Sequence, residues 1–494
     1  MRPRLSALAL ALLWVAGCAG PAVRPASLDG WQTVETRGVR LVAQASAEEL
    51  DALARDLSGF HAAFSYLIGR EIASTTRTTI ALVRDPALAG RIGLGQGVGG
   101  FAWTTFDGAF AFVLLEPSRV GTRITLFHEY THLLLSRHRS ALIPRWYTEG
   151  LADYFSTVAF RDGALVIGAL PAGRLGWLVQ RRKPMPLDLL FGGDREATLS
   201  GKATYDFYAT AWALTHYLLA SQKGRGELSG FEKELAKGTA LDAAREAAFG
   251  RSFERLTEEL TTHIGYLARG AAAESVLDPR QVRVPQPSPA APMRRGEVAD
   301  VLGSLALTLS DDSEEDGQDR YVSFARAYLG VAVDEDGANV RARAALARAR
   351  ALGGDPHGAE ELLAGALRDA PADPQVQLDS GHVALAAGAA GEAEARFRRA
   401  LELDPRSAAI WFGLGRALAR GGQPEPALAA LERARTLGWS GELDLELGRL
   451  HVAAHRAPEA RALLQPLAVD PHGGRVAEQA AELLQEIDSA GEAH

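Results

Sequence analysis

The sequence is poor in cysteine, in net charge and in long apolar segments, and each shortage excludes a class of protein. Cys18 is the single cysteine among 494 residues, so the chain can form no internal disulfide and has no thiol elsewhere for a metal site or a nucleophile. The formal net charge is only −8, and no tract is rich in lysine and arginine, which argues against a nucleic-acid-binding protein. Beyond Cys18, no run approaches the roughly 20 apolar residues that cross a bilayer.

The N-terminus has the composition of an export signal. Arg2 and Arg4 precede a short apolar run at residues 5–15, and small residues then lead into Cys18. This segment resembles the lipobox of bacterial lipoproteins, which implies that Cys18 is lipidated and becomes the mature N-terminus. The residue after the cysteine is Ala19 rather than aspartate, which within that resemblance favours the outer membrane. The alternative is an ordinary secretory signal in which Cys18 has no role.

A metal-binding pattern stands near the middle of the N-terminal half. His128, Glu129 and His132 form an H-E-x-x-H motif, and helix positions i and i+4 share one face. Two imidazoles on one face can bind a single zinc ion, and Glu129 can act as a general base on a water at the metal. The motif alone is a moderate signal, because it also arises by chance on polar helices.

Two carboxylates downstream strengthen the zinc prediction. Glu149 follows His132 by 17 residues and could supply a third ligand from the next helix, beyond a loop that ends at Pro144. Asp153 lies four residues later on the same face and could accept a hydrogen bond from the outer N–H of a ligating histidine. The competing interpretations are a solvated acid at a helix start for Glu149 and a surface or capping acid for Asp153. His138 is not spaced as a ligand.

The N-terminal part is expected to mix strands and helices. Strands are predicted at residues 39–43, 78–83 and 109–115, a helix at 47–68 and a glycine-rich loop at 90–100, while helices dominate from 149 to 266. A strand beside the metal helix could pair with a substrate backbone if it formed the edge of the sheet. Residues 109–115 are the candidate, and an interior position for them is equally compatible with the sequence.

A proline-rich stretch at residues 284–292 separates this part from a helical one with a 34-residue period. Ala359, Ala393 and Ala427 keep that spacing, as do Ala366, Ala400 and Ala434. The period resembles tetratricopeptide repeats, which stack helical hairpins into a superhelix whose concave face usually binds peptides or proteins. We expect three or four clear repeats with degenerate helices at either end.

The residues around the motif resemble a known group of enzymes. H-E-x-x-H followed by W-x-x-E-G-x-A-x-Y is similar to the gluzincin metallopeptidases, and more narrowly to a bacterial peptidase-MA-like family. Members of that family carry a domain of unknown function, often joined to tetratricopeptide repeats. The resemblance covers roughly residues 31–266 and includes a later block at 207–214, in which Ala211 replaces the usual serine. The matching positions near the motif are Trp146, Glu149, Gly150, Ala152 and Tyr154.

The resemblance implies an α+β zincin-like metallopeptidase domain with one Zn²⁺ ion bound by His128, His132 and Glu149. It implies that Glu129 takes the proton from a zinc-activated water and passes it to the leaving amine. Gluzincins commonly stabilise the oxyanion with a tyrosine or histidine from a downstream helix. Tyr208 is the leading candidate for that role, followed by Tyr205 and His216.

The sequence therefore predicts a signal peptide at 1–17, a tether at 18–30, a zincin-like domain at 31–270, a linker at 271–296 and an all-α repeat domain at 297–494. The expected function is a zinc peptidase. The sequence shows no obvious cluster of acids that would bind a terminal amine, which favours an endopeptidase. It would be lipid-anchored on the periplasmic face of the outer membrane, with repeats that bind a protein substrate or partner. The alternative is a non-catalytic envelope scaffold that acts through its repeats.

Overall fold

The computed structural model describes most of the chain. The described residues are 27–68, 78–94, 98–106, 108–136, 143–161, 164–192, 201–237, 239–270, 274–277, 284–311, 315–468 and 474–492. The signal segment with Cys18 and the residue His138 lie outside them. No helix within the described ranges is long and apolar enough to span a bilayer.

A six-stranded sheet forms the centre of the N-terminal part, in the order β4-β5-β3-β2-β1-β9. Strands β2, β3 and β5 run parallel to one another in the middle of the sheet, and β4 closes one edge antiparallel to β5. Toward the other edge, β1 pairs antiparallel with both β2 and β9. The strands are β1 Gln32–Thr36, β2 Val39–Ala43, β3 Thr78–Val83, β4 Gly100–Thr105, β5 Gly108–Leu114 and β9 Ala291–Pro292.

The edge strand is not the one proposed from the sequence. β5, which covers the predicted strand at 109–115, lies between β3 and β4 and is therefore interior. The edge is β4, directly after the predicted glycine-rich loop, and helix α2 (Pro86–Ile92) overlaps the start of that loop. The strand was not predicted because glycines stand at positions 99 and 100, and glycine is depleted in strands. The interior alternative for residues 109–115 is the correct one.

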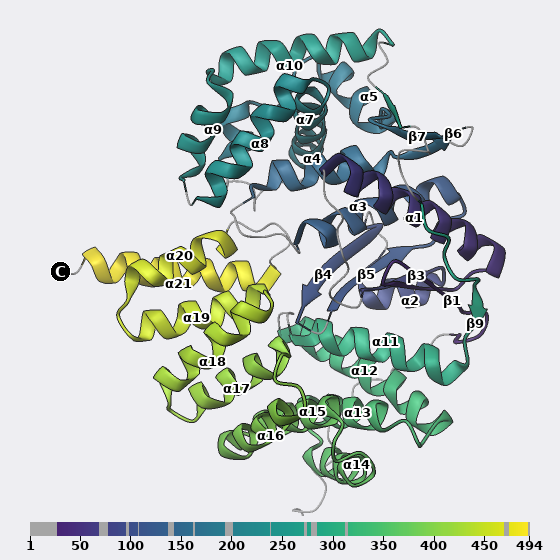
Figure 1. Cartoon of the computed structure of the whole chain (residues 1–494), viewed down its shortest axis with the longest axis vertical. Helices are drawn as coiled ribbons and strands as arrows, with labels where there is room; N and C mark the ends of the chain where they lie inside the picture. Colours follow the sequence, from purple (N-terminus) through teal and green to yellow (C-terminus); the bar gives the residue numbers. More distant parts are fainter. Residues whose placement is uncertain are drawn as a thin grey trace, which may run out of the picture.

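Alternate residues of the central strands face two different helical layers. Leu41, Ile80 and Val113 belong to a hydrophobic cluster shared with α1 (Ala47–Ile68) and α3 (Arg119–Ser136). Val42 and Phe112 point the other way, into a cluster with α2, α11 (Arg295–Asp311) and α12 (Glu315–Glu335). This alternation follows from the two-residue period of a strand. Figure 1 shows α11 and α12 lying along the sheet, so the first helices after the proline-rich stretch share a core with it.

A mainly helical group packs beyond α3 and carries the downstream parts of the candidate site. Its helices are α4 Arg145–Ser156, α5 Ala172–Arg181, α6 Leu187–Phe191, α7 Lys202–Leu219, α8 Gln222–Ala236, α9 Leu241–Phe249 and α10 Phe253–Ala268. A small sheet of β6 (Ala159–Arg161), β7 (Ala164–Ile167) and β8 (Ser275–Leu277) borders it. Together with the central sheet, these elements give the mixed α and β content that the sequence predicted.

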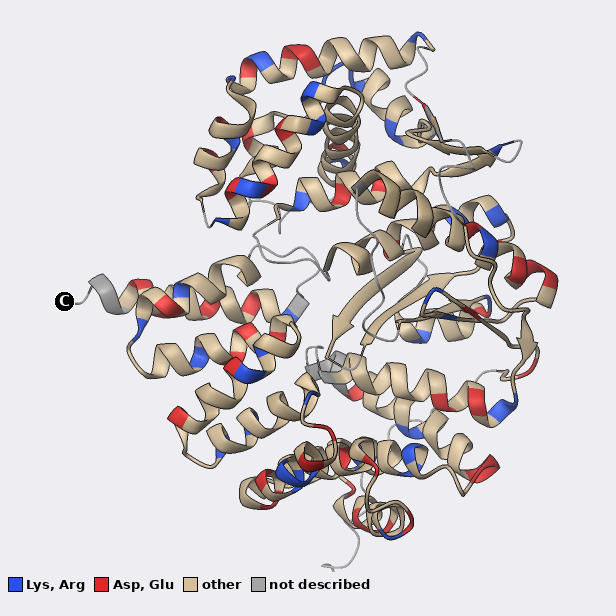
Figure 2. Cartoon of the chain, in the orientation of Figure 1, with Lys and Arg blue, Asp and Glu red and all other residues tan. Residues whose placement is uncertain are grey.

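The C-terminal part is a curved stack of helical hairpins (Figure 1). Small residues sit where the two helices of a hairpin cross: a Cβ on Gly415 would lie 2.4 Å from Leu431, and one on Gly448 would lie 2.5 Å from Leu464. Both acidic and basic positions occur among these helices (Figure 2), and α13 carries arginines and no acidic residue. The helices are α13 Val340–Leu352, α14 Pro356–Asp369, α15 Pro374–Ala386, α16 Ala390–Leu403, α17 Ala408–Arg420, α18 Pro424–Leu437, α19 Gly441–Ala453, α20 Ala457–Ala468 and α21 Gly474–Glu492.

The proline-rich stretch is attached to the sheet rather than extended away from it. The backbone N–H of Ser288 donates to the carbonyl of Glu35, and that of Met293 donates to the carbonyl of Trp31. The N–H of Ala290 donates to the Asp51 carboxylate at 2.8 Å. The predicted division into a domain at 31–270 and another at 297–494 stays a prediction, and the shared core with α11 and α12 joins the two parts physically.

Candidate metal centre

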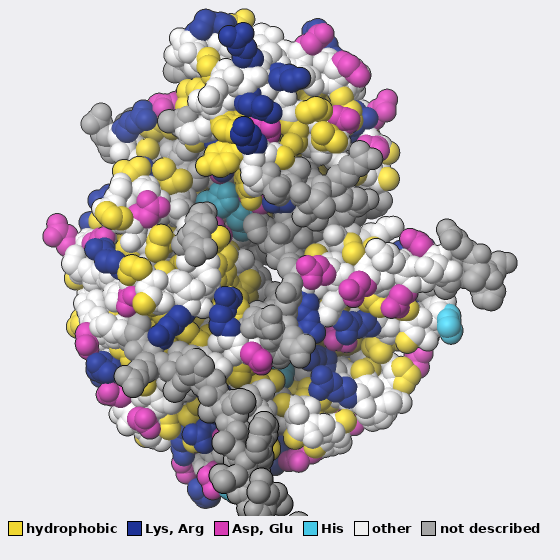
Figure 3. All heavy atoms as spheres, turned by 180° about the vertical axis from the view of Figure 1, so that it is seen from behind, with side chains coloured by type: hydrophobic (Ala, Val, Ile, Leu, Met, Phe, Trp, Pro, Cys, Tyr) yellow, Lys and Arg dark blue, Asp and Glu magenta, His cyan; other side chains and the backbone are white. Residues whose placement is uncertain are grey.

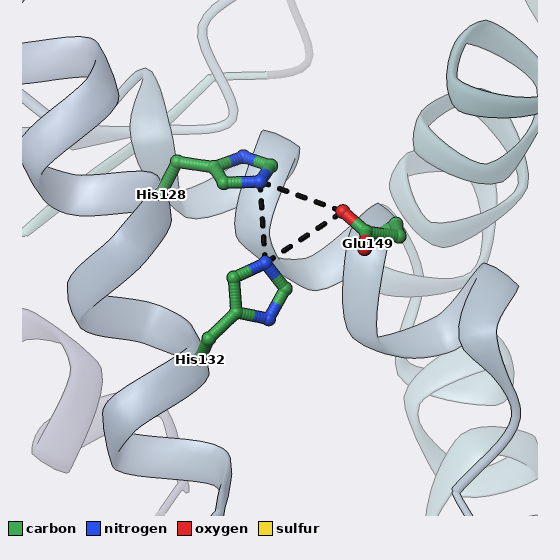
Figure 4. Close-up of side chains that lie close together, drawn as sticks. All are labelled: His128, His132 and Glu149. Carbon is green, nitrogen blue, oxygen red and sulfur yellow. Dashed lines mark hydrogen bonds and ion pairs between the residues drawn. The ribbon is translucent and has the colours of Figure 1, made fainter. Parts of the chain in front are cut away.

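Three potential ligands from α3 and α4 meet at one point. The Nε2 atoms of His128 and His132 lie 3.2 Å apart. The Oε2 atom of Glu149 lies 3.4 Å from the first of these nitrogens and 3.6 Å from the second. Figure 4 shows the three side chains directed at one another, two from one helix and one from the facing helix.

These separations suit a tetrahedral cation. Ligand atoms about 2.0–2.2 Å from a zinc ion at tetrahedral angles lie roughly 3.3–3.5 Å from one another. The three observed distances fall close to that range, and two imidazoles with one carboxylate are a donor set that zinc accepts. The side chains of His128 and His132 are 17% and 11% exposed, so solvent reaches the site. Figure 3 shows histidine side chains in a recess beneath the helices of the upper part of the molecule.

Tight packing of α4 against α7 fixes the position of Glu149, which is fully buried. Next to it, Gly150 faces α7 so closely that a Cβ there would lie 2.6 Å from the carbonyl oxygen of Ala211 and 2.2 Å from Oγ1 of Thr215. Trp146, one turn earlier, is also fully buried. The W-x-x-E-G pattern therefore brings a carboxylate to the histidines by means of a close helix crossing, and the alanine at 211 lies at that crossing.

Asp153 contacts His128 at the ring nitrogen that does not face the other two ligands. Its Oδ1 lies 3.2 Å from Nδ1 of His128, and its Oδ2 accepts a hydrogen bond of 2.7 Å from Nε of Arg174 on α5. Such a pairing fixes the tautomer of a histidine and raises its basicity. Burial by itself would lower the pKa of His128, but the hydrogen bonds to Asp153 and Glu149 outweigh it and raise that pKa well above 6.5. The site therefore attracts positive charge, whether a proton or a metal ion.

Arg174 has no counterpart among the residues that the sequence pointed to. Its guanidinium lies beside Asp153 and also 4.9 Å from the ring centroid of Tyr208. The pKa of Asp153, which burial would raise, is lowered by its contacts with His128 and Arg174. No motif could have indicated this arginine, because it lies 21 residues beyond its partner on another helix.

Glu129 is buried against the edge strand. Its exposed fraction is 7%, and a Cβ added to Gly100 of β4 would lie 2.9 Å from its Cγ. The negative charge of Glu129 contributes to the raised pKa of His128. Gly100 is therefore a site residue that sequence analysis assigned to a loop.

The three candidates for the oxyanion stabiliser have different positions. The ring of Tyr208 lies 4.9 Å from the guanidinium of Arg174, which binds Asp153, and burial together with the charge of Glu149 raises its phenol pKa. Tyr205 is 53% exposed, and its ring lies 5.2 Å from that of Trp177, measured between centroids, at a tilted angle. His216 is buried elsewhere, where Nδ1 lies 2.9 Å from His263 and Nε2 lies 3.2 Å from the Gly168 carbonyl. Tyr208 as the oxyanion stabiliser stays a prediction.

Comparisons with known proteins identify two segments. Residues 123–242, which contain all the side chains of this site, match a family described as "Protein of unknown function (DUF1570)", a description that names no activity. Residues 378–442 match the tetratricopeptide repeat family, which confirms the predicted repeats. No curated protein matches the chain significantly.

Several solved structures are similar to part of this chain. A thermophilic tetratricopeptide protein from Thermus thermophilus is 20% identical, with 37% of this chain and 99% of that chain covered and a TM-score of 0.33. PilF of Pseudomonas aeruginosa is 20% identical, with 39% and 93% covered and a TM-score of 0.27. A tetratricopeptide repeat protein from Parabacteroides merdae is 15% identical, with 54% and 100% covered and a TM-score of 0.33.

Proposed function

We propose that this protein is a zinc-dependent peptidase. The observation that carries the proposal is that the ligand atoms of His128, His132 and Glu149 lie within 4.8 Å of one another. Two imidazoles and a carboxylate form a donor set suited to zinc. Glu129, which has the chemistry of a general base, is buried beside them. The arrangement of sheet, motif helix and downstream glutamate helix also supports the zincin-like fold that the sequence resemblance implies.

Each side chain then has a defined task. His128, His132 and Glu149 would hold the ion, which when bound polarises a carbonyl and lowers the pKa of water at the site. Asp153 would keep His128 in the tautomer whose Nε2 faces the ion. Glu129 would accept the proton of the attacking water and deliver it to the leaving nitrogen.

Tyr208 supplies the remaining requirement, a hydrogen-bond donor for the developing oxyanion. A tyrosine phenol is protonated at neutral pH and can therefore donate, and burial together with the charge of Glu149 raises the pKa of Tyr208 further. Arg145 and Arg174 lie 5.8 Å and 4.9 Å from its ring centroid and favour a negative charge nearby.

The edge strand supports a peptide as the substrate class. β4 pairs with β5 on one side only, and among the described residues no strand pairs with its other side. An extended peptide can add to such an edge by backbone hydrogen bonds, which suit many sequences. Gly100, at the start of this edge, touches Glu129, so a peptide on β4 would lie next to the proposed base.

A second function, a non-catalytic scaffold of the envelope, is supported by the tetratricopeptide match. Such repeats commonly mediate protein–protein interaction, and the comparisons name no catalytic activity, so they favour this function over hydrolysis. The geometry of the ligands and of Glu129 favours hydrolysis instead. In either function we propose that lipidated Cys18 anchors the chain to the periplasmic face of the outer membrane and that the repeats contact a protein substrate or partner.

The Glu129→Gln variant distinguishes the two functions. The substitution keeps the shape of the side chain and removes the base, so we expect hydrolysis of an unfolded protein substrate such as casein to fall at least ~100-fold with zinc content unchanged. Glu258→Gln, on an exposed carboxylate of α10, is the matched control and should retain full activity. Equal activity in wild type and Glu129→Gln would refute the peptidase. A cellular phenotype lost on deletion of residues 301–494 and unaffected by Glu129→Gln would establish the scaffold.

A further inference from the structure

The tip of the edge strand is in contact with the repeat array. Phe106, immediately after β4, packs its ring 5.0 Å from that of Phe412 on α17, measured between centroids. A Cβ on Gly438, in the turn after α18, would lie 3.5 Å from Cδ1 of Phe106. Phe106 thus packs against two hydrophobic clusters of the array, together with Trp411 and Leu450. Figure 1 shows β4 running toward these helices.

The opposite end of the same strand is in contact with the motif helix. A Cβ on Gly100 would lie 2.9 Å from both Cγ of Glu129 and Cγ2 of Thr125, and one on Gly99 would lie 3.3 Å from Oγ1 of Thr125. The six residues of β4 span about 20 Å. One short strand therefore connects an aromatic contact in the repeats with the proposed general base.

We propose that the repeat array acts on its own chain as a brace for β4, and that Phe106 is a positioning residue for peptide binding beside Glu129. The proposal rests on the proposed peptidase function. Among the described strands β4 pairs only with β5, so contacts at its ends add to the restraint on this edge. β4 pairs with β5 along its whole length, and it is held further by the close contact of Gly100 with α3 at one end and by Phe106 in the array just beyond the other end.

The contact between Phe106 and Phe412 also gives part of the repeat array a role within its own chain. The surface of α17 around Phe412, which is 5% exposed, is covered by a segment of the same chain rather than left open to a partner. Removing either aromatic ring should free the tip of β4 without disturbing the three zinc ligands, since those lie on α3 and α4.

Hydrogen exchange of the full chain, followed by mass spectrometry, tests the brace. We expect the amides of residues 100–105 to exchange at least about tenfold faster in Phe106→Ala and in Phe412→Ala than in the wild type. Leu445→Ala is the matched control, because Leu445 is buried in the array in a cluster that does not include Phe106. It should leave exchange in β4 unchanged. If Phe412→Ala unfolds the array, Phe106→Ala tests the same contact from the other side.

Peptide hydrolysis provides the second measurement. With the brace lost, KM for an extended peptide should rise about tenfold while kcat and zinc content stay near the wild-type values, because the residues that perform the chemistry are untouched. Unchanged exchange in β4 in both aromatic variants would overturn the brace, whatever the activity. An inactive wild type would refute the peptidase function alone. The brace would still be supported if the amides of β4 exchanged faster in both aromatic variants and at the wild-type rate in Leu445→Ala.

Discussion

Asp153→Asn should weaken zinc binding without removing a zinc ligand. The carboxylate lies 3.2 Å from Nδ1 of His128 and is itself held by Arg174 at 2.7 Å. Asparagine retains one acceptor oxygen but loses the negative charge that raises the basicity of the histidine. It can also present its amide N–H₂ to the ring or to the guanidinium, which are both donors.

The expected loss of zinc affinity can be estimated because Asp153 contacts the ligand His128 and not the ion itself. Loss of a carboxylate that orients a metal-bound histidine reduces metal affinity by about 10–100-fold, which corresponds to roughly 1.4–2.8 kcal/mol. The burial of Asp153, which is only 6% exposed, places the effect toward the upper part of this range, since water cannot take over the contact.

Competition titration against a chromogenic zinc chelator measures the change directly. Asp206→Asn is the matched control, because Asp206 on α7 also accepts hydrogen bonds from an arginine, Arg181, but touches no histidine of the site. We expect the control to bind zinc like the wild type. Equal zinc affinity in wild type and Asp153→Asn, or an equal loss in both variants, would refute the reasoning.

Three further predictions concern packing, pH and catalysis. Gly150→Ala should lower the free energy of unfolding, measured with urea, by about 1–3 kcal/mol, because its methyl group meets the Ala211 backbone; unchanged stability would show that the helix crossing relaxes. In the metal-free protein the pKa of His128 is raised above 6.5, so its stabilisation is complete below pH 6.5 and is lost as the pH rises through the higher folded value. Calorimetry should therefore show a Tm that falls from pH 6.5 upward, and a Tm that rises would contradict this assignment. Tyr208→Phe should reduce kcat by about 100-fold or more at constant zinc content, and an unaltered kcat would remove this residue from the mechanism.

The meeting of His128, His132 and Glu149 was predictable because its geometry is mostly local. His128 and His132 share a helix face by spacing alone, and the W-x-x-E-G pattern placed Glu149 on a following helix. His216 lies eight residues beyond Tyr208 on α7, a rise of about 12 Å along the helix axis, and its ring nitrogens face His263 and the Gly168 carbonyl. The repeats were equally readable, because their period is a property of the sequence itself.

Other parts of the site depend on tertiary packing that no local pattern encodes. Arg174 reaches Asp153 only because α5 packs near α4, and Gly100 matters only because β4 lies against Glu129. The contact of Phe106 with Phe412 joins residues 306 positions apart. An amphipathic helix such as α11 likewise signals that one face is buried but does not identify the sheet that covers it.

The zinc content of the purified, folded chain tests the central claim most directly. Elemental analysis by mass spectrometry should find about one zinc ion per chain in the wild type and in Glu129→Gln, and far less in His132→Ala. Circular dichroism on the same samples would establish that each is folded. A folded wild-type protein that takes up no zinc when the ion is supplied would contradict the account.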